Sequence, residues 1–236
     1  MSRALGSWSA LGIVVAVAVF TVCFAAIPLT APFYLWTDLD GYLAYRRAHG
    51  QVFQHAAMLA MRLCGPLVVI LLSSIHDHAR EERRPLARIS LCCGASFAAL
   101  TGGHSFVPLT AVRLGLAGGE VRGLEQVVQA NPLSAVNLLG RALFLGLASL
   151  FAAPRFAWGG RERAIRCAFP ANGTCGLPGG VGDLLASVPL VFPTLDLGMG
   201  GAVLVAAIAL CALFRRAGRT TAGPAAVAVA PPGAAD

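Results

Sequence analysis

Long apolar runs alternate with short arginine-rich segments along the chain. The first run carries no charged side chain from Ala4 through Thr37. A helix needs about 20 consecutive apolar residues to cross the hydrocarbon core of a bilayer. Runs of about that length predict six membrane-spanning helices, at residues 8–29, 54–75, 89–112, 132–153, 173–193 and 197–214. We therefore expect an all-α transmembrane bundle that occupies residues 1–216 as a single domain.

Three parts of this prediction leave alternatives open. Arg3, the first apolar run and the small residues Ala25 and Ala26 also resemble a cleaved signal peptide, although the run is long for one. The fifth run contains Asp183 and is interrupted by prolines, so five full spans and one broken span is the variant of the six-span prediction. Residues 217–236 are rich in Ala, Pro and Gly, and we expect a disordered tail there.

The arginines between the predicted spans alternate in number along the chain. Cytoplasmic loops of membrane proteins carry an excess of Lys and Arg. Eleven arginines follow the second, fourth and sixth runs, and four follow the first and third: Arg80, Arg83, Arg84, Arg88, Arg155, Arg161, Arg163, Arg166, Arg215, Arg216 and Arg219 against Arg46, Arg47, Arg113 and Arg122. This alternation predicts an even number of spans with both termini in the cytoplasm.

The composition agrees with a chain that lies partly in lipid. Hydrophobic residues make up 57% of the chain and charged residues 12%, about half the usual share of a soluble domain, and the mean hydropathy is +0.72. All 18 basic residues are arginine, which excludes catalysis by a Schiff-base lysine and binding by a P-loop lysine. The abundance of Arg, Ala, Gly, Leu and Val is typical of a GC-rich genome, so we expect a bacterial inner-membrane protein.

The net charge of +7 and the seven cysteines add no further kind of site. Membrane topology explains the arginine clusters better than nucleic-acid binding does. The cysteines are odd in number and contain no CxxC pair, so they predict neither a disulfide framework nor a zinc site. We expect no cofactor, no metal and no nucleic-acid partner, and the sequence does not indicate an oligomeric state.

Three charged residues and one histidine lie well inside the predicted spans. Arg62, Arg141 and Asp183 are charged, and a charge at the centre of a bilayer costs about 2.5–3.5 kcal/mol on insertion scales. His104 is the fourth. The helical rise places Arg62 and Arg141 roughly 12–13 Å below the outer ends of their spans, and His104 at a similar depth. With Asn137 one turn outward of Arg141, these side chains could meet in the outer half of the bundle.

Three interpretations of this polar cluster stay open. Asp183 could form an internal ion pair with Arg62 or Arg141 and hold helices together. Either arginine could instead extend its long side chain to the outer interface. The functional interpretation is a pocket for a ligand with an apolar tail, and the excess of arginine favours an anionic head.

The residues Val136–Phe156 and Arg166–Phe214 resemble uncharacterised bacterial six-span membrane proteins. The resemblance is carried by Asn137-x-x-Gly140 at a helix start, by Ala152-Ala-Pro-x-Phe156 at a helix end, and by Ala171-Asn-Gly173. It implies a six-span bundle and implies no activity. In such proteins we expect an apolar or aromatic residue where this chain has Arg141 and Asp183.

Two classes of function follow. The first is a non-enzymatic membrane protein that binds or moves a small amphiphilic molecule, or supports a partner in the membrane. The alternative is an intramembrane enzyme of the isoprenoid cyclase or isomerase type. Asp183 would then be the catalytic general acid, with its pKa raised by apolar surroundings. A proton-coupled transporter has little support, because the spans hold a single carboxylate.

Overall fold

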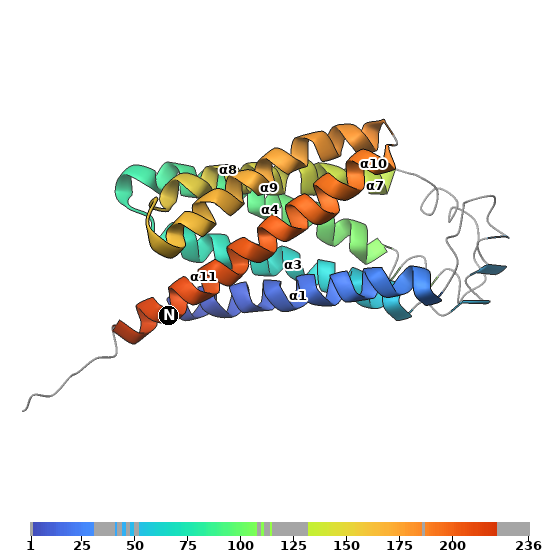
Figure 1. The fold of residues 1–236 in the computed structure, drawn as a ribbon, viewed down its shortest axis with the longest axis horizontal. Coiled ribbons are helices and arrows are strands. Elements are labelled where there is room, and N and C mark those ends of the chain that lie inside the picture. The colour runs from blue at the N-terminus through green and yellow to red at the C-terminus, as the bar shows by residue number, and fades with distance from the viewer. Residues whose placement is uncertain are drawn as a thin grey trace, which may run out of the picture.

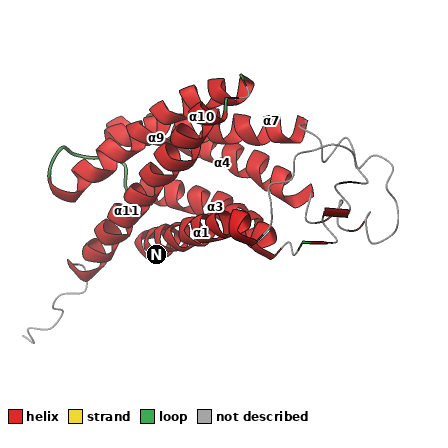
Figure 2. Cartoon of the chain, turned by 45° about the vertical axis from the view of Figure 1, so that its right-hand side comes forward, coloured by secondary structure: helices red, strands yellow, loops and turns green. Residues whose placement is uncertain are grey.

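The computed structural model describes residues 2–30, 52–107, 132–185 and 187–220, and the isolated positions 41, 44, 45, 48, 49, 110 and 114. Every element in these ranges is helical (Figures 1 and 2). In chain order they are α1 (Ser2–Thr30), α3 (Val52–Asp77), the 3-10 turn η1 (Glu81–Arg83), α4 (Arg84–Val107), α7 (Pro132–Leu138), the π-helical segment η3 (Leu139–Leu145), α8 (Gly146–Ala152), the 3-10 turn η4 (Ala153–Arg155), α9 (Gly160–Leu184), α10 (Val188–Val191), the π-helical segment η5 (Phe192–Met199) and α11 (Gly200–Thr220).

Two of the long helices are composite. The elements α7, η3, α8 and η4 follow one another without a break and form one helix, and α10, η5 and α11 form another. Each composite helix contains a π-helical segment, a geometry in which well under 1% of residues in globular proteins lie. The described residues therefore form six long helices, namely α1, α3, α4, the α7–η4 helix, α9 and the α10–α11 helix.

Among the described residues, five helices are long and apolar enough to cross a membrane: Arg3–Thr30, Val52–Asp77, Glu81–His104, Ala135–Arg155 and Pro189–Arg216. They overlap the first four predicted spans and the sixth, which confirms the helical, multi-pass character of the chain. The last helix is longer than expected at both ends. Its α11 part continues to Thr220, so the predicted tail begins inside a helix, and residues 221–236 lie outside the described part.

The fifth long helix differs most from the prediction. The range 173–193 is not one helix, because α9 ends at Leu184 and α10 begins at Val188. Instead α9 begins at Gly160, a residue with a φ of 56° that favours glycine, and α9 is not among the five apolar helices. Arg161, Arg163 and Arg166, which the sequence placed in a loop, thus lie in the first two turns of α9.

Helix α9 extends into the arginine-rich segment because one of its faces is buried. Ile165, Ala168, Phe169 and Asn172 follow one another at helical spacing, and all are buried, Ile165 and Asn172 completely. Proline lacks an N–H donor, and Pro170 and Pro178 both lie inside the helix. The hydroxyl of Thr174 donates a hydrogen bond of 2.9 Å to the Pro170 carbonyl oxygen. Packing against the bundle therefore determines this helix more than hydropathy does.

The six long helices form a closed ring. Each helix packs against the next one in the chain: α1 on α3, α3 on α4, α4 on η3 and α8, α8 on α9, and α9 on η5 and α11. The ring closes because α11 returns to pack against α1 (Figure 1). A ring of this kind leaves a central space that side chains from all the helices can fill.

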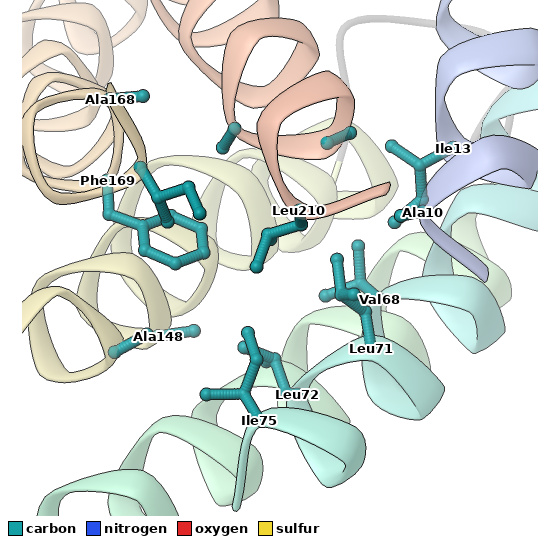
Figure 3. Packing of buried hydrophobic residues seen from close by; sticks show 14 of the residues in the cluster. Ala10, Ile13, Val68, Leu71, Leu72, Ile75, Ala148, Ala168, Phe169 and Leu210 are labelled. Carbon is teal, nitrogen blue, oxygen red and sulfur yellow. The ribbon is translucent and has the colours of Figure 1, made fainter. Parts of the chain in front are cut away.

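One half of that space is filled by a continuous apolar core. Ile13 of α1, Val68, Leu71 and Leu72 of α3 and Leu210 of α11 are buried there together (Figure 3). Ala148 of α8 and Phe169 of α9 complete the cluster from the other side of the ring. In a bilayer, close packing of this kind contributes more to helix association than the removal of apolar surface from water.

Arginine side chains gather at the end of the bundle nearest this core. The Nε of Arg3 donates a hydrogen bond of 3.0 Å to Nε2 of His78. Arg155 donates from Nε to the Ile75 carbonyl oxygen at 3.0 Å and from Nη2 to the carbonyl of His78. These bonds join the start of α1 to the imidazole of His78, and η4 to carbonyl groups at and just after the C-terminal end of α3, where a helix leaves its last carbonyls without an intrahelical partner. In the described part of the chain, arginines thus gather at this end, which we call the arginine-rich end.

Candidate functional site

A central cavity of about 280 Å³ adjoins the apolar core and shares Ile13 and Val68 with it. All the long helices except α9 contribute to its wall. The lining residues are Ile13, Val17, Phe20, Thr21, Met61, Cys64, Val68, Phe97, Arg141, Leu145, Leu195, Leu197, Met199, Gly200, Gly201, Val203 and Leu204. Ligand pockets in proteins usually measure about 300–1,000 Å³, so this volume suits a small molecule.

Most side chains of the cavity wall are apolar, and few are polar or charged. Among the described residues that line it, Arg141 is the one with a charged side chain, and Thr21 and Cys64 are the other polar ones. The Thr21 hydroxyl donates to the Val17 carbonyl oxygen at 2.8 Å, so its proton is used within its own helix. The wall therefore includes one arginine in an otherwise apolar lining.

The two π-helical segments both form part of this wall. Arg141 and Leu145 come from η3, and Leu195, Leu197 and Met199 come from η5. The segments also pack against each other through Ala142, Leu195 and Met199. A π-helical segment adds a residue to a turn and changes the direction of the side chains, and such segments occur frequently at functional sites. Their convergence marks this cavity as the candidate site.

Close helix contacts hold η3 in place on both of its sides. A Cβ atom added to Gly176 of α9 would lie 2.4 Å from the carbonyl oxygen of Ala142. A Cβ on Gly140 would lie 3.2 Å from Oγ1 of Thr101 in α4. Ala142 and Gly140 flank Arg141 in the sequence, so the two contacts fix the backbone that carries the guanidinium group.

The polar groups next to this wall are incompletely paired. Oγ1 of Thr101 and Oδ1 of Asn137 are buried and have no hydrogen-bond partner among the described residues. A buried polar atom without a partner costs roughly 1–3 kcal/mol. Thr101 contacts η3 at Gly140, and Asn137 lies one helical turn before Arg141. Two polar atoms without a partner among the described residues therefore lie close to the helix segment that carries Arg141.

The structure separates the two intramembrane arginines that the sequence grouped. Arg141 lines the cavity, whereas the guanidinium of Arg62 lies over the ring of Phe106, 4.6 Å from its centroid. Met61, the neighbour of Arg62, lines the cavity, and Arg62 itself does not. The attraction between a guanidinium and an aromatic face offsets part of the free-energy cost of burying the charge.

The other predicted site residues lie at different positions. His104 is half-buried in the last turn of α4, and Asn137 is half-buried in α7. Asp183 belongs to the last turn of α9, and its side chain lies outside the described residues. The expected ion pair of Asp183 with an arginine, and its role as a general acid, both stay predictions.

Sequence reasoning did not single out Thr101 or Cys64. Thr101 precedes His104 by three residues on one helix face, a signal that the sequence contained. Cys64 is buried and lines the cavity, but a cysteine in an apolar run has the pattern of a packing residue. Asp196 falls between the predicted spans 173–193 and 197–214, yet its backbone belongs to η5; its side chain lies outside the described residues.

The described residues contain no group of three or more His, Cys, Asp and Glu side chains that could hold a metal ion. Nδ1 of His78 donates to the Ser74 carbonyl oxygen at 2.7 Å and its Nε2 accepts from Arg3, so both ring nitrogens are engaged.

Comparison with known proteins finds no family model, no curated protein and no solved structure that matches this chain. The resemblance to six-span bacterial membrane proteins is therefore a prediction that these comparisons leave untested.

Proposed function

We propose that this protein crosses a bacterial inner membrane six times and binds a small amphiphilic molecule in its central cavity. The ligand's apolar part lies among the side chains of α1, α3 and α11, and its anionic head binds Arg141. The observation that carries the proposal is the cavity itself: a space of about 280 Å³ with an apolar wall and a single described charge.

The ring arrangement supports α9 as the sixth crossing helix. Helix α9 has 25 residues, which at 1.5 Å per residue gives roughly 37 Å, enough for a hydrocarbon core of about 30 Å. It runs beside α8 and α11 along the length of the bundle (Figure 1). The arginine-rich end would face the cytoplasm by the positive-inside rule, and both termini with it.

Arg141 suits an anionic head because of its depth and its surroundings. It precedes Arg155, at the arginine-rich end, by 14 residues of the same composite helix, or roughly 21 Å. A guanidinium group at such a depth benefits from an anion that forms two parallel hydrogen bonds with it. An amphiphile supplies that anion without adding polar surface to the rest of the cavity.

Calorimetric titration of the purified chain in nanodiscs of a zwitterionic lipid tests the binding proposal. The probes are decyl phosphate and 1-decanol, which share a chain and differ in the charge of the head. We expect Arg141→Gln to weaken decyl phosphate binding about tenfold or more and to leave decanol binding unchanged. Arg62→Gln is the matched control, because it also removes one intramembrane guanidinium but does not line the cavity.

A second pair of variants tests whether the cavity is the site. Gly200 lines the cavity, and Gly102 of α4 does not; a Cβ on either would meet no atom within 4 Å. Gly200→Leu should therefore fill the cavity and abolish binding of both probes, and Gly102→Leu should leave it intact. Equal losses in Arg62→Gln and Arg141→Gln, or normal binding in Gly200→Leu, would falsify the proposal.

The six-span topology has its own test. In a background without the native cysteines, Ser187→Cys and Ala157→Cys place thiols at opposite ends of α9. With six spans, a membrane-impermeant maleimide labels position 187 in intact cells and position 157 only after the membrane is permeabilised. Labelling of both positions from outside, or of neither, contradicts the crossing of α9.

A further inference from the structure

A second hollow of about 410 Å³ lies on the outside of the ring, between α1 and α11. Its wall is formed by Leu11 and Val14 of α1, Ile208 and Ala212 of α11, and the two arginines that follow them, Arg215 and Arg216. We call it the α1–α11 groove. It is apolar along its length and basic at one end, the arginine-rich end of the bundle.

Direct helix contacts close the bottom of this groove. The Ser7 hydroxyl and the Cys211 thiol are 3.9 Å apart, and a Cβ on Gly6 would lie 3.0 Å from the ring of Phe214. Cys211 is buried, but Ile208 is 52% exposed. The groove is therefore open away from the ring, where the bilayer would be, and is separate from the central cavity.

The two helices that form the basic end of the groove supply no acidic side chain. Neither α1 nor α11 contains an Asp or a Glu residue. Arg215 and Arg216 are exposed, and neither forms an ion pair with a carboxylate of the described residues. Arg215 follows Ile208 by seven positions, so the apolar part extends roughly 10 Å along α11 from the charges. An apolar channel that ends in two unneutralised cations complements a molecule with an anionic head and a long chain.

We propose that the α1–α11 groove binds an anionic phospholipid. Its headgroup phosphate accepts hydrogen bonds from Arg215 and Arg216, and one acyl chain lies along Leu11, Val14 and Ile208. Basic pockets between membrane helices bind the headgroups of anionic lipids in this way. The proposal rests on the membrane location proposed above and is independent of ligand binding at Arg141.

The chemistry of the groove favours a lipid over other occupants. A nucleic acid would engage the arginines and leave the apolar wall exposed. A second copy of the chain, docked by this groove on itself, would bring four arginines together without an acid from α1 or α11 to balance them. Phosphatidylglycerol provides both the phosphate and the chain.

Native mass spectrometry of the purified full-length chain tests the proposal, with dioleoylphosphatidylglycerol and dioleoylphosphatidylcholine as competing lipids. We expect the wild type to retain phosphatidylglycerol in preference, and Arg215→Gln/Arg216→Gln to lower its affinity about tenfold or more. Arg84→Gln/Arg88→Gln removes the same charge from exposed positions at the same end and should retain the wild-type affinity. Ala212→Phe keeps the charges and narrows the groove, and it should also lower the affinity.

Each contrary result overturns the proposal. Equal retention of both lipids shows that the headgroup charge is not recognised. An equal loss in the Arg84/Arg88 variant shows a general charge effect, and full affinity in Ala212→Phe shows that the groove takes no chain. If inorganic phosphate or glycerol phosphate raises the unfolding temperature as much as phosphatidylglycerol does, the site binds a free anion. Decyl phosphate titration of the Arg215→Gln/Arg216→Gln variant separates the two proposals. Binding as in the wild type shows that the site at Arg141 is intact even if the groove binds no lipid.

Discussion

Gly176 of α9 lies directly against the backbone of Ala142 in η3. A Cβ atom at position 176 would stand 2.4 Å from the Ala142 carbonyl oxygen, closer than real Cβ contacts occur. A Cβ atom on Gly180, one turn further along α9, would lie 3.2 Å from the Cβ of the same Ala142. Small residues that allow two helices to approach in this way are the usual interface of membrane helices. Here they press α9 against the helical turn that carries Arg141.

Gly176→Ala should therefore push α9 away from η3. Overpacking of this kind costs about 1–3 kcal/mol, and the thermal unfolding midpoint in detergent measures the loss. The affinity for decyl phosphate should fall as well, because Arg141 moves with its backbone. Gly102→Ala is the control, since a Cβ there meets open space. An unchanged midpoint for Gly176→Ala would show that the two helices are free to separate.

Asn172 and Ser149 form a buried hydrogen bond between α9 and α8. The Asn172 amide donates to Oγ of Ser149 at 2.6 Å and reaches the carbonyl oxygen of Leu145, the last residue of η3, at 3.5 Å. Asn172→Ala and Ser149→Ala should each lower stability, and the double variant should lose less than the sum. We expect a coupling free energy of about 0.5–1.5 kcal/mol from the double-mutant cycle. Strict additivity would mean that the bond contributes nothing between the helices.

The side chain of Arg155 joins two helices through backbone carbonyls. It donates to the carbonyls of Ile75 and His78 at the end of α3, and its guanidinium lies 5.3 Å from the centroid of the Phe156 ring. Arg155→Gln should cost about 1.5–3 kcal/mol, because carbonyls at a helix end lose a charged donor. Arg155→Lys should recover only part of this, since one ammonium lacks the planar fork of a guanidinium.

Arg84→Gln provides the comparison for Arg155. Arg84 is at the same end of the bundle, and its guanidinium lies 3.7 Å from the carboxylate of exposed Glu81. An exposed pair of this kind contributes about 0–1 kcal/mol. If Arg155→Gln and Arg84→Gln lower the unfolding midpoint equally, the bonds from Arg155 to α3 are not what stabilises this end.

Cys64 provides a chemical readout of the central cavity. It is buried, it lines the cavity, and it carries a free thiol, whereas Cys92 is an exposed free thiol on α4. Saturating decyl phosphate should slow the modification of Cys64 by methyl methanethiosulfonate and leave the rate at Cys92 unchanged. Mass spectrometry of the two peptides measures both rates in one sample. Equal effects at the two thiols would place the ligand elsewhere.

The sequence was sufficient to locate the helices whose apolar runs are long, such as α1 and α3. It misplaced α9 because the buried face of that helix begins among arginines and includes Asn172. Ile165, Ala168 and Phe169 carry the periodicity of a buried helix, but only their packing partners make that periodicity decisive. Hydropathy measures the affinity of a segment for lipid. It does not identify α9, because packing against the neighbouring helices of the ring determines where α9 begins and ends.

Arg62 and Arg141 show the same limit for the candidate site. Each is a charge inside an apolar run, and the sequence signal for both is identical. The position of Arg62 depends on Phe106, 44 positions away in the chain, and that of Arg141 on the π-helical turn that directs it to the cavity. The sequence therefore identifies the unusual residues, and the fold determines which of them meets a ligand.

The π-helical turns of η3 and η5 also bear on how such a bundle could change over evolutionary time. Each turn is an insertion absorbed within a helix, without a loop. Removing one residue from such a turn restores the α-helical register. The part of the helix after the deletion then rotates by about 100° relative to the part before it. A deletion in η3 or η5 would thus present a different row of side chains to the cavity while leaving the arginine-rich end unaltered. Relatives that differ in length at these two places should differ in what they bind.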